Sequence, residues 1–303
     1  MDAILSRANL HGANLEYAHL DGALLQDAIL TDAAASGASF VGATLKNTEL
    51  GGVVLEKAKL TRATLDSVIM RKSRLDGAQL DQASLRYIDT TDGASFVGVD
   101  FTEAGIEWCK FLASDFRAAR FEGARFRDVA FERCTFDSRT VFTGATFDGE
   151  VEISRAMADG VAASRRPRPR RISGTAAANR SRGPSLGLNL AGLNFLGKLL
   201  ANRAKLAGAS FRGTAISNGE LKEAIAPRAN FSGAALSKVE FTGAQLQGAT
   251  FRGATLDAVN FAECDLDGAD FTGATIVSAE FGNARGRAIG LPAGVSKSMA
   301  TRG

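Results

Sequence analysis

Three cysteines and two histidines are the side chains of this sequence best suited to nucleophilic or metal chemistry. Cys109, Cys134 and Cys264 lie far apart and form no C-x-x-C pair, so the sequence holds neither a disulfide framework nor a zinc-binding spacing. Each cysteine stands two residues before a large apolar residue, at a position usually taken by alanine, which predicts a buried packing role. His11 and His19 have no clustered cysteines or carboxylates beside them, so they make a weak metal site.

Carboxylates are numerous, but they occupy outward positions of a five-residue repeat, described below, where polar residues of many kinds occur. Examples are Asp76, Asp81 and Asp100. Paired carboxylates at such positions are far more often solvated than catalytic. The sequence also lacks a G-x-S-x-G motif, a Walker loop and a zinc-finger spacing. We therefore expect a protein that is not an enzyme, with no catalytic residue, cofactor, metal ion or small-molecule substrate.

Three large aromatic side chains are better candidates for binding than for catalysis. Tyr17, Tyr87 and Trp108 each stand two residues after a large apolar residue, at an outward position. Exposed aromatic residues favour contact with a protein partner. The alternative is that these residues are isolated on the surface and bind nothing. The five-residue repeat described below is interrupted by one extra residue near Thr90. If this residue forms a bulge that leaves the repeat unrotated, we expect the three aromatic side chains to lie at different or distant corners.

An arginine-rich segment interrupts the sequence between Ser164 and Arg182, where seven arginines occur without one acidic residue. Its prolines and glycines oppose regular structure. The segment is predicted to be a solvated linker, and the alternative is contact with nucleic acid or an anionic membrane, including nuclear targeting in a eukaryotic cell. The candidate contact residues are Arg165, Arg166, Arg168, Arg170 and Arg171.

A five-residue repeat must position nearly all of these side chains. Large apolar residues recur at every fifth position from Leu5 to Leu85, again from Phe96 to Phe136, and again from Leu206 to Phe281, with Ala35 and Ala226 as the exceptions. The residue two positions earlier is always small, most often alanine. A helix has a period of 3.6 and a strand a period of 2, so neither accounts for this spacing. A solenoid with flat walls and a corner every five residues does, with the large and small residues pointing inward.

The repeat resembles the pentapeptide-repeat family. Ala8-Asn9-Leu10-His11-Gly12 and Ala269-Asp270-Phe271-Thr272-Gly273 carry the match, which covers most of the chain. The resemblance implies an all-β fold, a right-handed quadrilateral β-helix with four pentapeptides in each coil. It implies little about function, because the roles of the family differ widely.

The breaks in the repeat divide the chain into four parts. Residues 1–149 are the first β-helix block, 150–185 the irregular Arg-rich linker, 186–285 the second block, and 286–303 a polar tail. Residues 186–200 open the second block either as a coil centred on Leu190, Phe195 and Leu200, or as a short capping helix, and we favour the coil. The strict alternation of Phe with Leu or Ile from Phe231 to Phe281 places Phe on two opposite walls.

The net charge of +3 hides an uneven distribution that bears on function. Residues 1–150 hold 16 basic and 22 acidic side chains, whereas residues 151–185 hold 8 and 2. The best-known members of the family protect or inhibit DNA gyrase by presenting a duplex-like acidic rod. A mimic as long as the first block needs roughly 20 net negative charges, because duplex DNA carries one charge per ~1.7 Å. The most acidic side, which includes Asp21, Asp100 and Glu122, also carries Lys59 and Arg120, so mimicry is only an alternative.

The function that the sequence favours is a non-catalytic rod or scaffold that binds an unidentified protein partner. An open coil end exposes strand edges and apolar side chains, so self-association through the coil ends is a further expectation. The chain has no recognisable secretory signal and no apolar run near the ~18 residues that span a bilayer. We therefore expect a cytoplasmic protein, with a bacterial effector or secretion-system accessory exported without a Sec signal as the alternative.

Overall fold

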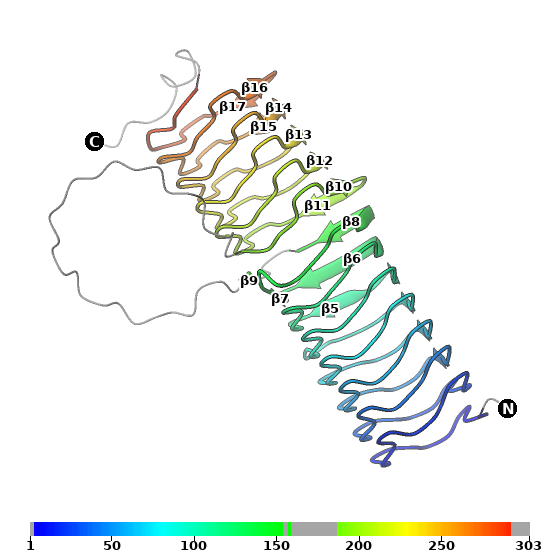
Figure 1. The fold of residues 1–303 in the computed structure, drawn as a ribbon. Helices are drawn as coiled ribbons and strands as arrows, with labels where there is room; N and C mark the ends of the chain where they lie inside the picture. Colours follow the sequence, from blue (N-terminus) through cyan, green and yellow to red (C-terminus); the bar gives the residue numbers. More distant parts are fainter. Residues whose placement is uncertain (1–2, 154–156, 159–186, 292–303) are drawn as a thin grey trace, which may run out of the picture.

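The computed structural model describes residues 3–153, 157–158 and 187–291 of the chain, and these form a single rod of stacked coils (Figure 1). The N-terminal coils lie at one end of the rod and the last coils before residue 291 at the other. Within the described residues, no helical segment has the length and hydropathy that crossing a bilayer requires.

A regular coil of the rod contains four five-residue sides, as the family resemblance implied. Parallel bridges join residues that are 20 positions apart, as between Ile4 and Leu24. The chain turns at each corner through a hydrogen bond such as that from the Ala8 N–H to the Leu5 carbonyl, at 3.0 Å. The third residue of this turn, Arg7, has a φ of 62°, which explains why glycine is frequent at corners.

Most strands belong to one parallel sheet that follows one wall along the rod. In order, they are β1 (Thr44–Lys46), β2 (Thr64–Asp66), β3 (Ser84–Arg86), β4 (Gly105–Glu107), β6 (Arg125–Glu132), β8 (Thr146–Glu152), β10 (Asn194–Phe195), β12 (Ala215–Ser217), β13 (Ala235–Ser237), β14 (Thr255–Asp257) and β16 (Thr275–Ile276). The remaining pairings are β5 (Lys110–Leu112) with β6, β11 (Lys198–Leu200) with β8, β7 (Thr135–Phe136) with β9 (Met157–Ala158), and β15 (Val259–Asn260) with β17 (Ala279–Glu280).

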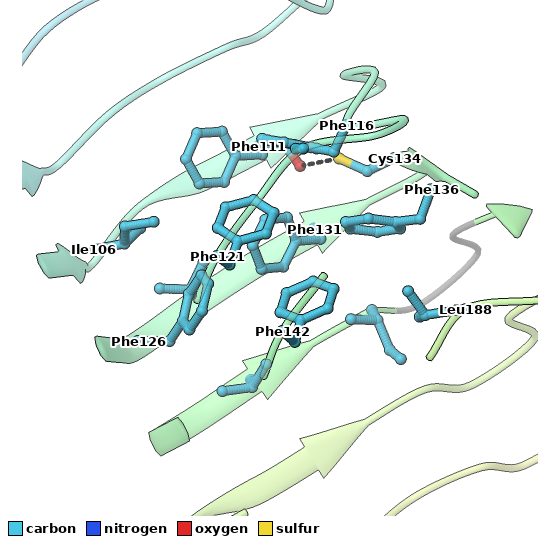
Figure 2. Close-up of a cluster of buried hydrophobic side chains, with 14 of the residues drawn as sticks. Ile106, Phe111, Phe116, Phe121, Phe126, Phe131, Cys134, Phe136, Phe142 and Leu188 are labelled. Carbon is cyan, nitrogen blue, oxygen red and sulfur yellow. Dashed lines mark hydrogen bonds between the residues drawn. The ribbon is translucent and has the colours of Figure 1, made fainter. Parts of the chain in front are cut away.

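The interior is filled by stacked apolar side chains, including all 19 phenylalanines. Figure 2 shows one cluster of these buried side chains, in which rings from successive coils lie above one another. Phe96 and Phe116 stack with centroids 4.8 Å apart, and Phe101 and Phe121 with centroids 4.9 Å apart. In this part of the rod each coil therefore covers the rings of the coil before it, and this contact stabilises the rod along its axis.

Two one-residue slips lengthen the coil to 21 residues without rotating the walls. After the first slip, Arg74 pairs with Ser95 and Leu85 with Ile106, so each wall continues in line. Thr90 takes an interior position at this slip, and its buried hydroxyl bonds to the Ser114 hydroxyl at 2.9 Å. The extra residue is thus absorbed at one corner, where polar groups satisfy one another.

The second slip is held by Asp137, which is almost fully buried. Burial opposes the charge of this carboxylate, but hydrogen bonds from the Ala118 N–H and from Arg139 outweigh it and keep the pKa of Asp137 below its usual range. The backbone N–H donors lie at 2.9 and 3.0 Å from one carboxylate oxygen. This side chain therefore replaces backbone partners that the regular coil would supply.

The two repeat blocks share one sheet. β8 of the first block pairs with β10 and β11 of the second, and the rings of Phe147 and Phe195 stack with centroids 4.8 Å apart. The expected coil at the start of the second block is confirmed by these pairings. Its expected centre at Leu200 is wrong, because Leu199 and Ala201 are the buried residues there and Leu200 lies between them on the outer face.

Candidate functional site

The three cysteines lie in the interior, as predicted, and none of their thiol groups is exposed. The Sγ atoms of Cys109, Cys134 and Cys264 donate to backbone carbonyls, as from Cys134 to Phe111 at 3.3 Å (Figure 2). Burial raises the pKa of each thiol to about 12. The thiolate that nucleophilic chemistry requires is therefore scarce at neutral pH.

We expect the folded protein to resist thiol-specific reagents at pH 8. All three thiols should react at least a hundredfold more slowly than free cysteine, because burial limits both ionisation and access. All three should react promptly in 6 M guanidinium chloride, where the core is exposed. Absorbance after addition of Ellman's reagent measures both rates, and rapid labelling of a natively folded sample would contradict the burial of these residues.

The two histidines do not meet. His11 lies over Thr31, with its Nδ1 atom 2.9 Å from the Thr31 carbonyl oxygen, whereas His19 belongs to another wall, where it bridges to Ser39. Among the residues that the structure describes, no group of three or more His, Cys, Asp or Glu side chains could hold a metal ion.

The carboxylates singled out in the sequence bind neighbouring backbone and hydroxyl groups. Asp76 accepts from the Ser95 hydroxyl, and Asp100 accepts from the N–H of Thr102 at 3.0 Å. On the most acidic side, Arg120 lies 3.6 Å from Asp100 and 2.6 Å from Glu122. The guanidinium of Arg120 thus neutralises part of the charge that a mimic of DNA would need to display.

The structure brings Tyr87 and Trp108 together and leaves Tyr17 apart. The rings of Tyr87 and Trp108 stack with centroids 5.4 Å apart and planes 14° apart. The expectation that all three aromatics would lie at different or distant corners is wrong for this pair, because the slip at Thr90 makes a 21-residue coil and keeps both residues in one corner column. Tyr17 lies on the opposite corner, where its ring covers Gly37.

Arg86 completes this aromatic cluster, which we define as Arg86, Tyr87 and Trp108. Its guanidinium carbon lies 4.9 Å from the Trp108 ring centroid and 5.7 Å from that of Tyr87. Its Nε atom also lies 3.8 Å from Glu107 on the next coil. Half of the Tyr87 surface remains exposed. The cluster is thus a rigid, partly solvated aromatic surface on the middle of the rod.

A groove of about 390 Å³ adjoins this cluster, on the side of Trp108 away from Tyr87. The acidic residues of this groove are not among the candidate binding residues that the sequence indicates. Counting one coil onward from Trp108 would have found Asp128, because 20 residues separate the two. The groove is lined by Trp108, Cys109, Lys110, Asp128, Val129, Ala130, Glu150 and Glu152.

The candidate arginines of the linker lie outside the described residues. Their proposed contacts with nucleic acid or membrane therefore stay a prediction. The residues concerned are Arg165, Arg166, Arg168, Arg170 and Arg171.

The geometry defines a β-solenoid repeat protein, and comparison with known families identifies the repeat. A model described as "Pentapeptide repeats (8 copies)" matches residues 3–40, 38–77 and 48–86, and one described as "Pentapeptide repeats (9 copies)" matches residues 236–285. The chain is a pentapeptide-repeat protein.

Solved structures similar to this chain include HetL, a pentapeptide repeat protein involved in regulation of heterocyst differentiation in the cyanobacterium Nostoc sp. strain PCC 7120. HetL is 22% identical, with 86% of this chain and 88% of HetL covered and a TM-score of 0.24. QnrB1, a plasmid-mediated fluoroquinolone resistance protein, is 16% identical over 86% of this chain and 90% of its own, with a TM-score of 0.34. A thylakoid-lumen protein of Arabidopsis thaliana is 26% identical over 33% of this chain and 63% of its own, with a TM-score of 0.26. The search of curated proteins gives no match.

Proposed function

We propose that this protein is a non-catalytic rod that binds a protein partner through its outward walls. The observation that carries the proposal is the stacked Tyr87–Trp108 pair, which presents aromatic surface beside a groove. Large aromatic side chains contribute much of the binding energy at protein interfaces. An aromatic pair fixed in place by stacking also loses little conformational entropy on binding.

The rest of the described molecule supports a binding role over a catalytic one. The cysteine thiols are buried and protonated, and the interior is occupied by stacked apolar rings. Mimicry of DNA fits less well, since the acidic side chains of the first block are interspersed with bases and paired to them. The parallel bridges along the walls hold the outward side chains in fixed rows, which suits recognition of an extended or flat protein surface.

Affinity capture with the full-length chain as bait tests this function. We expect a partner to be recovered from the native cell extract by the natural protein and by Tyr17→Asn, and to be lost with the double variant Tyr87→Asn, Trp108→Asn. Asparagine is chosen because these corner residues have φ between 52° and 57°, a conformation that asparagine tolerates. Recovery of nothing but the bait itself, or equal recovery by all three proteins, would refute the proposal.

A further inference from the structure

The groove beside Trp108 lies at a bulge between β6 and β8, which lie in the middle of the rod (Figure 1). Arg127 pairs with Asp148 and Val129 pairs with Val151, so Gly149 and Glu150 oppose the single residue Asp128. The corner column that carries Tyr87 and Trp108 continues through Asp128 to Gly149. The glycine there leaves room for the Asp128 carboxylate, which a Cβ at this position would overlap, and bulges commonly re-aim side chains beside binding sites.

A short side chain also stands at the centre of the groove, between two longer ones. Lys110, Ala130 and Glu152 stand in register on three adjacent strands, as the pairings Lys110↔Ala130 and Ala130↔Glu152 show. The short Ala130 side chain separates the two charged ones and opens the floor between them. The hollow therefore has an apolar floor and polar rims.

Negative charge predominates at these rims. Three carboxylates, on Asp128, Glu150 and Glu152, line the groove together with one ammonium group, on Lys110. Asp128 is fixed in place because one of its oxygens accepts the Glu150 N–H at 2.9 Å. Glu150 and Asp128 are exposed, so their charges face any molecule that enters.

Trp108 supplies the second element of a cation site. One face of the indole stacks on Tyr87 of the preceding coil, whereas the groove contains residues of the following coil. Arg86 already makes a cation–π contact with this ring, 4.9 Å from its centroid. Tryptophan is the strongest cation–π acceptor among the side chains, and nearby carboxylates add to the attraction of a guanidinium or ammonium group.

We propose that this groove binds an arginine or lysine side chain of an extended, basic segment of a protein partner. The proposal rests on the proposed function and specifies the chemistry of that partner. The cation would lie against Trp108 with Glu150 and Glu152 as its counter-charges, and the flanking backbone would follow the wall of the rod. An acidic ligand is disfavoured by the excess of carboxylates at the same rims.

The single tryptophan of the chain is Trp108, so its fluorescence reports on this groove alone. The probe is an acetylated, amidated octapeptide of alternating Arg and Ser, titrated into the full-length protein. We expect a saturable change in emission, and at least tenfold weaker binding for the double variant Glu150→Gln, Glu152→Gln. Glu263→Gln, which removes an exposed acid on the distant part of the rod, is the matched control and should change affinity less than twofold.

The contribution of the ring is tested separately, with the same peptide labelled by fluorescein and followed by anisotropy. Trp108→Asn should weaken binding at least tenfold, Trp108→Phe should retain most of the affinity, and Tyr17→Asn should have no effect. Equal affinity for an octapeptide of alternating Glu and Ser would overturn the proposal. Unchanged affinity in Glu150→Gln, Glu152→Gln would also overturn it.

A final variant decides whether the natural occupant comes from a partner or from this chain. Replacing the five candidate linker arginines with serine should leave the affinity for the basic peptide unchanged. A tenfold increase would show that the linker itself competes for the groove, and the assignment to a partner would be withdrawn. A further outcome is that affinity capture of a partner depends on Tyr87 and Trp108 while no basic peptide binds the groove. In that case the proposed protein-binding function stands, and the proposal that the bound segment is basic is refuted. The substitutions are Arg165→Ser, Arg166→Ser, Arg168→Ser, Arg170→Ser and Arg171→Ser.

Discussion

Replacing Phe116 with alanine should lower the free energy of unfolding by about 3–5 kcal/mol. The ring is fully buried, stacks on Phe96 with centroids 4.8 Å apart, and meets the edges of Phe111 and Phe131 at 5.2 and 5.4 Å. The coils above and below are fixed by parallel backbone hydrogen bonds, such as that from the Phe116 N–H to the Thr135 carbonyl at 2.8 Å. Because the walls resist collapse, the loss of the ring leaves a cavity.

Urea denaturation followed by circular dichroism measures this change, with Phe116→Leu as the control. Leucine occupies the same interior column at Leu55 and Leu75, two coils and one coil before Phe96, so Phe116→Leu should lose much less stability. An alanine variant that unfolds within about 1 kcal/mol of the natural protein would contradict the rigid interior described above.

Replacing Gly197 with alanine should separate the two repeat blocks. A Cβ at this position would overlap the backbone carbonyl of Gly149 on the preceding coil, and this neighbour cannot rotate away as a side chain can. Relief requires the coils to move apart where β8 meets β10 and β11. We expect a loss of about 3 kcal/mol or more, which is at the upper end for overpacking because the clash involves two backbones.

Gly105→Ala is the matched control for this substitution. Gly105 lies in β4, on the wall that β10 continues, and a Cβ there would have no neighbour within 4 Å, so little change is expected. The separation of the blocks should appear as a new early transition in urea and as earlier proteolysis between them. Identical unfolding curves for Gly197→Ala and Gly105→Ala would show that the junction adapts without cost.

The sequence alone determined which side chains point inward, because this property repeats with the local turn geometry of each five-residue unit. The phenylalanines and the three cysteines are buried as the period predicts. The alternation in the second block also places Phe on two opposite walls, as the stacks Phe231–Phe251 and Phe241–Phe261 confirm. The failure at Leu200 occurs where the period is weakest, since apolar residues on both sides of it could take the interior position.

Which outward residues become neighbours depends on how successive coils are stacked. Lateral contacts join side chains one coil apart, and the length of a coil changes from 20 to 21 residues wherever a corner absorbs an extra one. For this reason the stacking of Tyr87 on Trp108 could not be read from the five-residue pattern, although both were singled out as binding candidates. The bulge that places Asp128 and Glu150 beside Trp108 likewise depends on the register between β6 and β8. Which residues point inward is a local property of the repeat. The binding surface depends instead on the strand registers, which are set by the length of each successive coil along the rod.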